Sequence, residues 1–77
     1  MKIKILGTGC PKCAKLYENA KEAATRTGKD FTIEKVTQIQ DIIAYGVMMT
    51  PALVIDDKVK FTGKVPSVEE LEKMFKS

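Results

Sequence analysis

A short connection near the C-terminus sets the strongest limit on how this chain can fold. Two apolar runs, residues 52–55 and 59–61, are separated only by Asp56, Asp57 and Lys58. A crossover between parallel strands needs a dozen or more residues, whereas a few residues are enough for a hairpin. The two runs are therefore predicted to pair as antiparallel strands.

The N-terminal half predicts the opposite arrangement. Residues 2–6 form a short apolar run with lysine at alternate positions, and residues 31–36 are rich in strand-forming side chains. Between them, residues 11–27 place apolar side chains at spacings of three and four, which predicts an amphipathic helix that stops at Gly28. A strand, a helix and a second strand in this order indicate a right-handed parallel crossover.

Two further helices are predicted from capping patterns. Thr37 is followed three residues later by Gln40, and Ser67 by Glu70, which is the spacing of a capping box. The first box precedes a short helix that ends near Gly46. The second precedes a terminal helix with one apolar stripe, formed by Val68, Leu71, Met74 and Phe75.

The predicted order is therefore β-α-β-α-β-β-α, which is an α/β fold. Its four strands form a mixed sheet, and the apolar stripes of the helices must be buried against both faces of that sheet. A chain of 77 residues has material for one hydrophobic core. We expect residues 1–77 to form a single domain.

Composition excludes several classes of function. The 13 basic and 10 acidic residues are interspersed, so no nucleic-acid-binding stripe is expected. The longest apolar runs fall far short of the roughly 20 residues that cross a bilayer, and no signal-peptide pattern follows Met1. We expect a cytoplasmic monomer. The absence of histidine excludes a Cys-His pair, a Ser-His-Asp triad and histidine-containing zinc sites.

The chain has two cysteines, Cys10 and Cys13, in one Cys-x-x-Cys unit after the first predicted strand. Pro11 suits the first position of the helix, which makes Cys10 the predicted N-cap. The sulfur of Cys10 would then face unpaired backbone N–H groups and the positive end of the helix dipole. These surroundings and the neighbouring Lys12 favour a thiolate, so Cys10 is the predicted nucleophile.

Cys13 returns to nearly the same face of the helix, with its Cβ atom roughly 5–6 Å from that of Cys10. It shares the apolar stripe, so we expect its thiol to be more buried and less acidic. The pattern predicts that the Cys10 thiolate attacks a substrate disulfide and that Cys13 then resolves the mixed disulfide. This chemistry needs no metal or organic cofactor.

Two alternatives use the same pair of thiols. Two thiolates can hold a soft ion such as Cu(I) or a metalloid, which predicts a carrier, although the hairpin and terminal helix differ from the β-α-β-β-α-β order of copper carriers. The pair could also belong to a redox-sensing interaction module. Mutation discriminates them, because only an exchange enzyme accumulates a mixed disulfide when Cys13 is replaced.

Three features in order resemble the thioredoxin superfamily in its minimal, glutaredoxin-like form. They are Gly9-Cys10-Pro11-Lys12-Cys13 after the first strand, Thr50-Pro51 at the start of the third, and Gly63 before the final helix. More narrowly, the chain is similar to the small redox-active disulfide proteins of archaea and bacteria. The resemblance covers nearly the whole chain.

The resemblance implies that the third strand runs antiparallel beside the first and that the Thr50-Pro51 bond is cis. It further implies that the backbone of Thr50 binds an extended substrate beside Cys10, while Pro51 shields the site. Gly9, Pro11 and Lys12 would form the active-site loop. The implied partners are disulfide-containing proteins and an electron donor, either a reductase or glutathione.

Three other side chains could belong either to the site or to the core. Tyr17 lies on the Cys13 side of the predicted helix, and an aromatic residue at that spacing is expected in the core. Met48 and Met49 precede Thr50. For them, core packing or a surface for a partner is more plausible than metal ligation.

Overall fold

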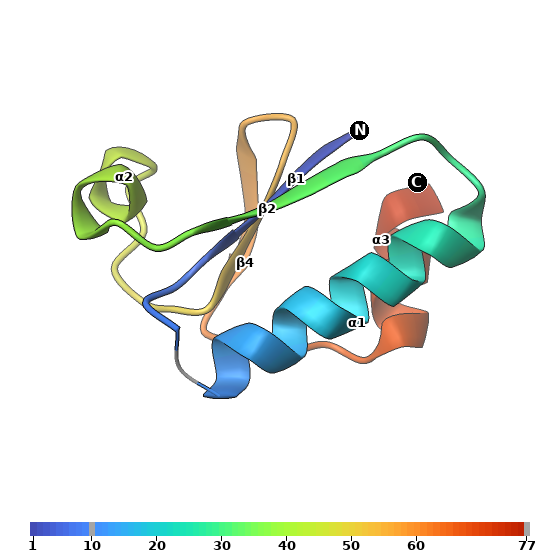
Figure 1. The fold of residues 1–77 in the computed structure, drawn as a ribbon, viewed down its shortest axis with the longest axis horizontal. Helices are drawn as coiled ribbons and strands as arrows, with labels where there is room; N and C mark the ends of the chain where they lie inside the picture. Colours follow the sequence, from blue (N-terminus) through green and yellow to red (C-terminus); the bar gives the residue numbers. More distant parts are fainter. Residues whose placement is uncertain (10, 77) are drawn as a thin grey trace.

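The computed structural model describes residues 1–9 and 11–76, so Cys10 and Ser77 lie outside the described residues. Figure 1 shows the fold, with its elements in the order β1 (Lys2–Leu6), α1 (Pro11–Thr27), β2 (Thr32–Val36), α2 (Ile39–Ala44), β3 (Ala52–Ile55), β4 (Lys58–Thr62) and α3 (Val68–Lys76). The predicted order of elements is confirmed.

The four strands form one mixed sheet in the order β2-β1-β3-β4. β1 pairs with β2 in parallel and with β3 antiparallel, so Ile5 has Lys35 on one side and Leu53 on the other. β3 and β4 form the predicted hairpin. Its turn is shorter than predicted because Asp56 and Asp57, both with positive φ, suffice to reverse the chain, and β4 begins at Lys58.

The two faces of the sheet carry different helices, as Figure 1 shows. α1 and α3 cover one face and bury the larger cluster of apolar side chains, made of Ile3, Ile5, Leu16, Ala20, Ala23, Ala24, Leu53, Ile55, Leu71 and Phe75. The short α2 covers part of the other face. It closes a smaller cluster made of Leu6, Ile42, Val47, Ala52 and Val54.

The longest helix, α1, forms as its sequence predicts. Its apolar stripe is buried, and Glu22 pairs with Arg26 one turn later at 3.3 Å. Gly28 follows with a φ of 72°, a conformation that glycine adopts without steric cost and that ends the helix. Neither this helix nor any other in the described ranges is long and apolar enough to cross a membrane.

The two predicted capping boxes have different outcomes. At α3 the Oγ of Ser67 accepts a hydrogen bond from the N–H of Glu70, and Glu70 Oε1 accepts one from the N–H of Ser67, so this box is confirmed. At α2 the prediction is wrong, because the N-cap is Gln38 and no side chain caps the helix. Thr37 lines a cavity under α1 instead.

Candidate active site

Cys13 sits in the first turn of α1 with its side chain 6% exposed, as the apolar stripe predicted. It packs against Gly7, the residue that follows β1. A Cβ atom built at Gly7 would collide with Cys13 Sγ and lie 3.0 Å from Cys13 Cβ. Position 7 must therefore lack a side chain for the sulfur to occupy its place, a requirement that the sequence alone did not reveal.

The segment before β3 also lies at the end of β1 beside Gly7, a place that we call the corner at Gly7. The peptide bond between Thr50 and Pro51 is cis, as the resemblance implied. Pro51 is fully buried while Thr50 is exposed. A Cβ at Gly7 would lie 3.9 Å from Thr50 Cβ, so Cys13 and Thr50 flank the same glycine. Residues from two distant parts of the sequence thus converge at one end of β1.

A backbone hydrogen bond fixes the position of this segment. The N–H of Gly63 donates to the carbonyl oxygen of Pro51 at 2.7 Å. Gly63 has a φ of 70°, and the Met49 methyl group would lie 3.2 Å from a Cβ there. Gly63 was predicted only as a marker before the last helix. In the structure it holds the Pro51 segment against the end of β4.

The remaining predicted loop residues lie around the start of α1. Gly9 is exposed with a φ of 94°, and Pro11 and Lys12 are exposed in the first turn of the helix. Cys10 lies outside the described residues, and its roles as N-cap and nucleophile remain predictions. The structure thus brings Cys13, Gly9, Thr50 and Pro51 into one region beside the start of α1.

An apolar groove of about 610 Å³ opens beside Thr50. Its lining residues come from the loop after β1, from α2 and from the segment after α2, namely Thr8, Ile39, Ile42, Ile43, Gly46, Val47, Met48 and Thr50. Met48 is 97% exposed and Met49 is 62% exposed, so core packing does not explain these two methionines. The groove provides apolar surface next to the exposed Thr50.

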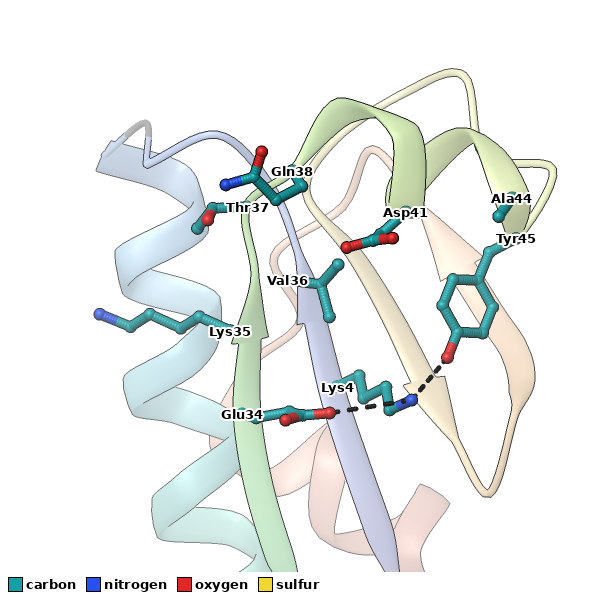
Figure 2. A pocket seen from close by; sticks show the side chains of 9 residues that line it. All are labelled: Lys4, Glu34, Lys35, Val36, Thr37, Gln38, Asp41, Ala44 and Tyr45. Carbon is teal, nitrogen blue, oxygen red and sulfur yellow. Dashed lines mark hydrogen bonds and ion pairs between the residues drawn. The ribbon is translucent and has the colours of Figure 1, made fainter.

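A smaller cavity of about 100 Å³ adjoins Cys13 on the other side. Lys35 and Thr37 of the β2 segment line it, and neither was predicted to take part in the site. The available signal was strand alternation, because positions 33, 35 and 37 share one face of β2 and Ile33 packs against the α1 side of the sheet. Figure 2 shows Lys35 and Thr37 extending toward α1.

A polar cluster occupies the opposite face of the sheet, away from Cys13. Lys4 Nζ donates to the hydroxyl of Tyr45 at 2.7 Å and pairs with Glu34 at 3.7 Å and Asp57 at 3.8 Å. Figure 2 shows Lys4 between Glu34 and Tyr45. The hydrogen bond to Tyr45 raises the pKa of Lys4 above its ordinary value of 10.5, and the nearby carboxylates add to that shift. These contacts join β1, β2, α2 and the hairpin turn.

Comparison with known proteins identifies the family. The thioredoxin-domain family matches residues 1–76. The chain belongs to this family. It is 48% identical over 75 residues to a thioredoxin of Methanocaldococcus jannaschii, covering 97% of this chain and 86% of the relative. It is 40% identical over 74 residues to a thioredoxin of Methanothermobacter thermautotrophicus, covering 96% of each.

Family membership confirms three predictions. The resemblance to thioredoxins is correct, and so is the minimal thioredoxin-like fold with its mixed four-stranded sheet. The predicted function class, thiol-disulfide oxidoreductase, is confirmed with them. Among the described residues, no group of three or more potential metal ligands gathers at one point.

Proposed function

We propose that this member of the thioredoxin-domain family reduces disulfide bonds of other proteins, with Cys10 as the attacking thiol and Cys13 as the resolving thiol. The observation that carries the proposal is the shared corner at Gly7, where the buried Cys13 sulfur and the exposed Thr50 flank one residue. A bound substrate at Thr50 would therefore lie close to the Cys-x-x-Cys unit.

The proposed reaction has two exchange steps. The Cys10 thiolate attacks one sulfur of the substrate disulfide, forming a Cys10-substrate bond and releasing the other substrate sulfur as a thiolate. Cys13 then loses its proton and attacks Cys10, which forms the Cys10-Cys13 disulfide and releases the second substrate thiolate. Both substrate thiolates take up protons from water. Two electrons pass from the cysteine pair to the substrate.

We propose that the substrate binds at the segment of Thr50 and Pro51. Pro51 is buried and tied to Gly63 through its carbonyl oxygen, so the exposed backbone next to it is held in place. An extended peptide could add its own backbone hydrogen bonds there, as peptides do at other exposed strand-like edges. The apolar groove beside Thr50 would take side chains of the same peptide.

The donor that reduces the pair again is proposed to be a thiol partner, either a reductase protein or glutathione. We also propose that the protein is a cytoplasmic monomer, because in that compartment a Cys-x-x-Cys pair is used for exchange rather than as a structural crosslink. Glutathione as donor requires a glutathione adduct on Cys10 as an intermediate. Mass spectrometry of the alkylated protein in glutathione buffer detects that adduct and separates the two donors.

Trapping of mixed disulfides tests the assignment of roles. The reduced Cys13→Ser variant is mixed with insulin, a protein with accessible disulfides, quenched with acid and separated without reductant. We expect a covalent complex through Cys10 in Cys13→Ser and none in Cys10→Ser. The double variant is the control for non-covalent association. Equal complexes in both single variants would contradict the assignment.

A further inference from the structure

Two of the four methionines are exposed directly before Thr50. Met48 is 97% exposed and Met49 is 62% exposed, whereas Met1 and Met74 are partly buried against the larger core cluster. Methionine is among the residue types most often buried in folded proteins, because its side chain is apolar. Neither the packing of the fold nor the proposed exchange reaction accounts for these two exposed side chains.

Met48 lines the apolar groove, and Met49 does not. The other lining residues come from α2, its neighbouring loops and Thr50, and none of the described lining residues is charged. Met49 instead packs against Gly63, where its methyl group would lie 3.2 Å from a Cβ atom. A chemical change at Met48 therefore alters the groove, while the same change at Met49 lies outside it.

The groove and the proposed exchange site share Thr50. Thr50 flanks Gly7 together with Cys13, and it also lines the groove. A substrate segment bound at Thr50 therefore has the groove beside it, and its apolar side chains gain from leaving water there. Met48 then belongs to the surface that the substrate covers.

The exposed sulfur of Met48 is open to a reaction that makes the side chain polar. A peroxide transfers one oxygen atom to a methionine thioether. The sulfur gives an electron pair to a peroxide oxygen, the O–O bond breaks, and the other oxygen leaves as water or as an alcohol. The sulfur is oxidised by two electrons and the peroxide is reduced by two. Methionine sulfoxide reductases convert the product back to the thioether.

We propose that Met48 is a site of reversible oxidation by peroxides, and that its sulfoxide weakens the binding of substrates whose apolar side chains enter the groove. The proposal rests on the proposed function, because it concerns regulation of the same substrate site. A sulfoxide that a substrate covers loses hydrogen bonds to water, and apolar side chains offer none in return. Substrate affinity falls, while the exchange chemistry of the two cysteines is unchanged.

The place of oxidation is tested in the double variant Cys10→Ser/Cys13→Ser, which has no thiol to compete for the oxidant. The variant is treated with hydrogen peroxide for increasing times, digested and analysed by tandem mass spectrometry. We expect Met48 to gain one oxygen several times faster than Met74, the internal reference packed against the core. Equal rates at these two methionines would contradict the inference.

Insulin reduction with dithiothreitol as electron donor tests the effect on substrate binding. The natural protein is first oxidised to its internal disulfide, which protects the thiols, and is then treated with peroxide and freed of it. We expect the KM for insulin to rise about three- to tenfold with kcat unchanged, as for a loss of binding common to ground state and transition state. Reduction of hydroxyethyl disulfide, which has no apolar side chain for the groove, should keep its rate.

Two leucine variants are the matched controls, and each is compared with itself before and after peroxide. Met48→Leu has no sulfur in the groove, so its KM should be the same before and after treatment. Met49→Leu should show the same rise in KM as the natural protein. Met48→Gln places a polar amide on an unbranched side chain at this position and should have a raised KM without any peroxide.

Three results would overturn the inference about Met48. They are an unchanged KM in natural protein that is oxidised at Met48, an equal rise in treated Met48→Leu, and an equal loss of rate with hydroxyethyl disulfide, which would place the effect outside the groove. A failure of the proposed function looks different, because it appears before any peroxide is added. If the untreated protein reduces neither disulfide, the exchange reaction is absent and the inference that rests on it is wrong as well.

Discussion

The two faces of the sheet differ in how completely they are covered. The face under α1 and α3 buries Leu16, Leu53 and Leu71 with no measurable exposure. The face under α2 has a helix of six residues, and Ile39 and Ile43 of that helix are more than 60% exposed. The first face therefore supplies most of the hydrophobic stabilisation, while the second keeps apolar surface accessible.

The candidate active site joins these two faces at the end of β1. Cys13 is a buried residue of α1, the helix of the closely packed side, and its sulfur occupies the space next to Gly7. Thr50 and the apolar groove belong to the α2 side. The closely packed surroundings of Cys13 and the apolar groove beside Thr50 thus lie on either side of one glycine.

Truncation of the core should show the difference between the faces most strongly. Leu16→Ala removes a fully buried side chain under α1 and should lower the free energy of unfolding by about 3–5 kcal/mol. Ile42→Ala should cost less, about 2 kcal/mol, because Ile42 already borders the open groove and leaves no closed cavity. Urea unfolding followed by circular dichroism measures both. Equal losses would contradict the comparison.

Gly7→Ala tests the corner where the faces meet. The added methyl group collides with Cys13 Sγ, so the sulfur or the strand end must shift. We expect a loss of about 1–3 kcal/mol in the free energy of unfolding, as for other overpacked sites. The attack of Cys13 on the mixed disulfide at Cys10 should also slow, which delays the release of reduced substrate. Gly46→Ala is the control for stability, because a Cβ there meets no atom and only the cost of its positive φ remains.

Substitutions at the two predicted capping positions, Ser67 and Thr37, should change the free energy of unfolding by smaller amounts. Ser67→Ala removes both hydrogen bonds of the Ser67 hydroxyl at the start of α3 and leaves the bond from the Ser67 N–H to Glu70 Oε1. It should lower the free energy of unfolding by about 1 kcal/mol. Thr37→Ala should cost almost nothing, because the Thr37 hydroxyl caps no helix. A substantial loss in thermal stability for Thr37→Ala would show that the predicted box at α2 forms in solution.

Replacing Lys4 in the polar cluster on the α2 face should change the stability least, and this change should depend on pH. The hydrogen bond to Tyr45 raises the pKa of Lys4, because the folded state binds the Lys4 proton more tightly than the unfolded state does. The stability that the charged Lys4 contributes is therefore complete below the pKa of an unfolded lysine, about 10.4. It is lost as the pH rises through the higher pKa of the folded state. The stability difference between the natural protein and Lys4→Met should therefore be constant near neutral pH and shrink above about pH 10.5. Lys2→Met, on the same strand face, is the control.

Much of the fold could be predicted from the sequence because its signals are local. The three-residue connection forced a hairpin, and the apolar spacing from Pro11 to Thr27 gave the bounds of α1. Thr37 misled the prediction because a threonine with Gln40 three residues later fits a capping box, whereas the N-cap of α2 is the next residue, Gln38, and no side chain caps the helix.

The site was predicted in part, and for different reasons at each residue. Cys13 and the Thr50-Pro51 segment could be predicted from motifs, since their residue types are unusual. The role of Gly7 could not, because a glycine after a strand is also an ordinary turn residue and its contact with Cys13 arises only through tertiary packing. Lys35 was missed for the same reason. A lysine on an edge strand is common, and only the tertiary structure places Lys35 in the wall of the small cavity beside Cys13.

The most direct test of the central claim is the equilibrium between the Cys10-Cys13 dithiol and its disulfide. The protein is equilibrated in defined glutathione and dithiothreitol buffers, alkylated and weighed by mass spectrometry. A reversible internal disulfide with a midpoint between about −200 and −290 mV is the predicted result, because exchange catalysts of this kind have potentials in that range. If no internal disulfide forms anywhere in this range, the protein does not use Cys10 and Cys13 as a redox-active pair.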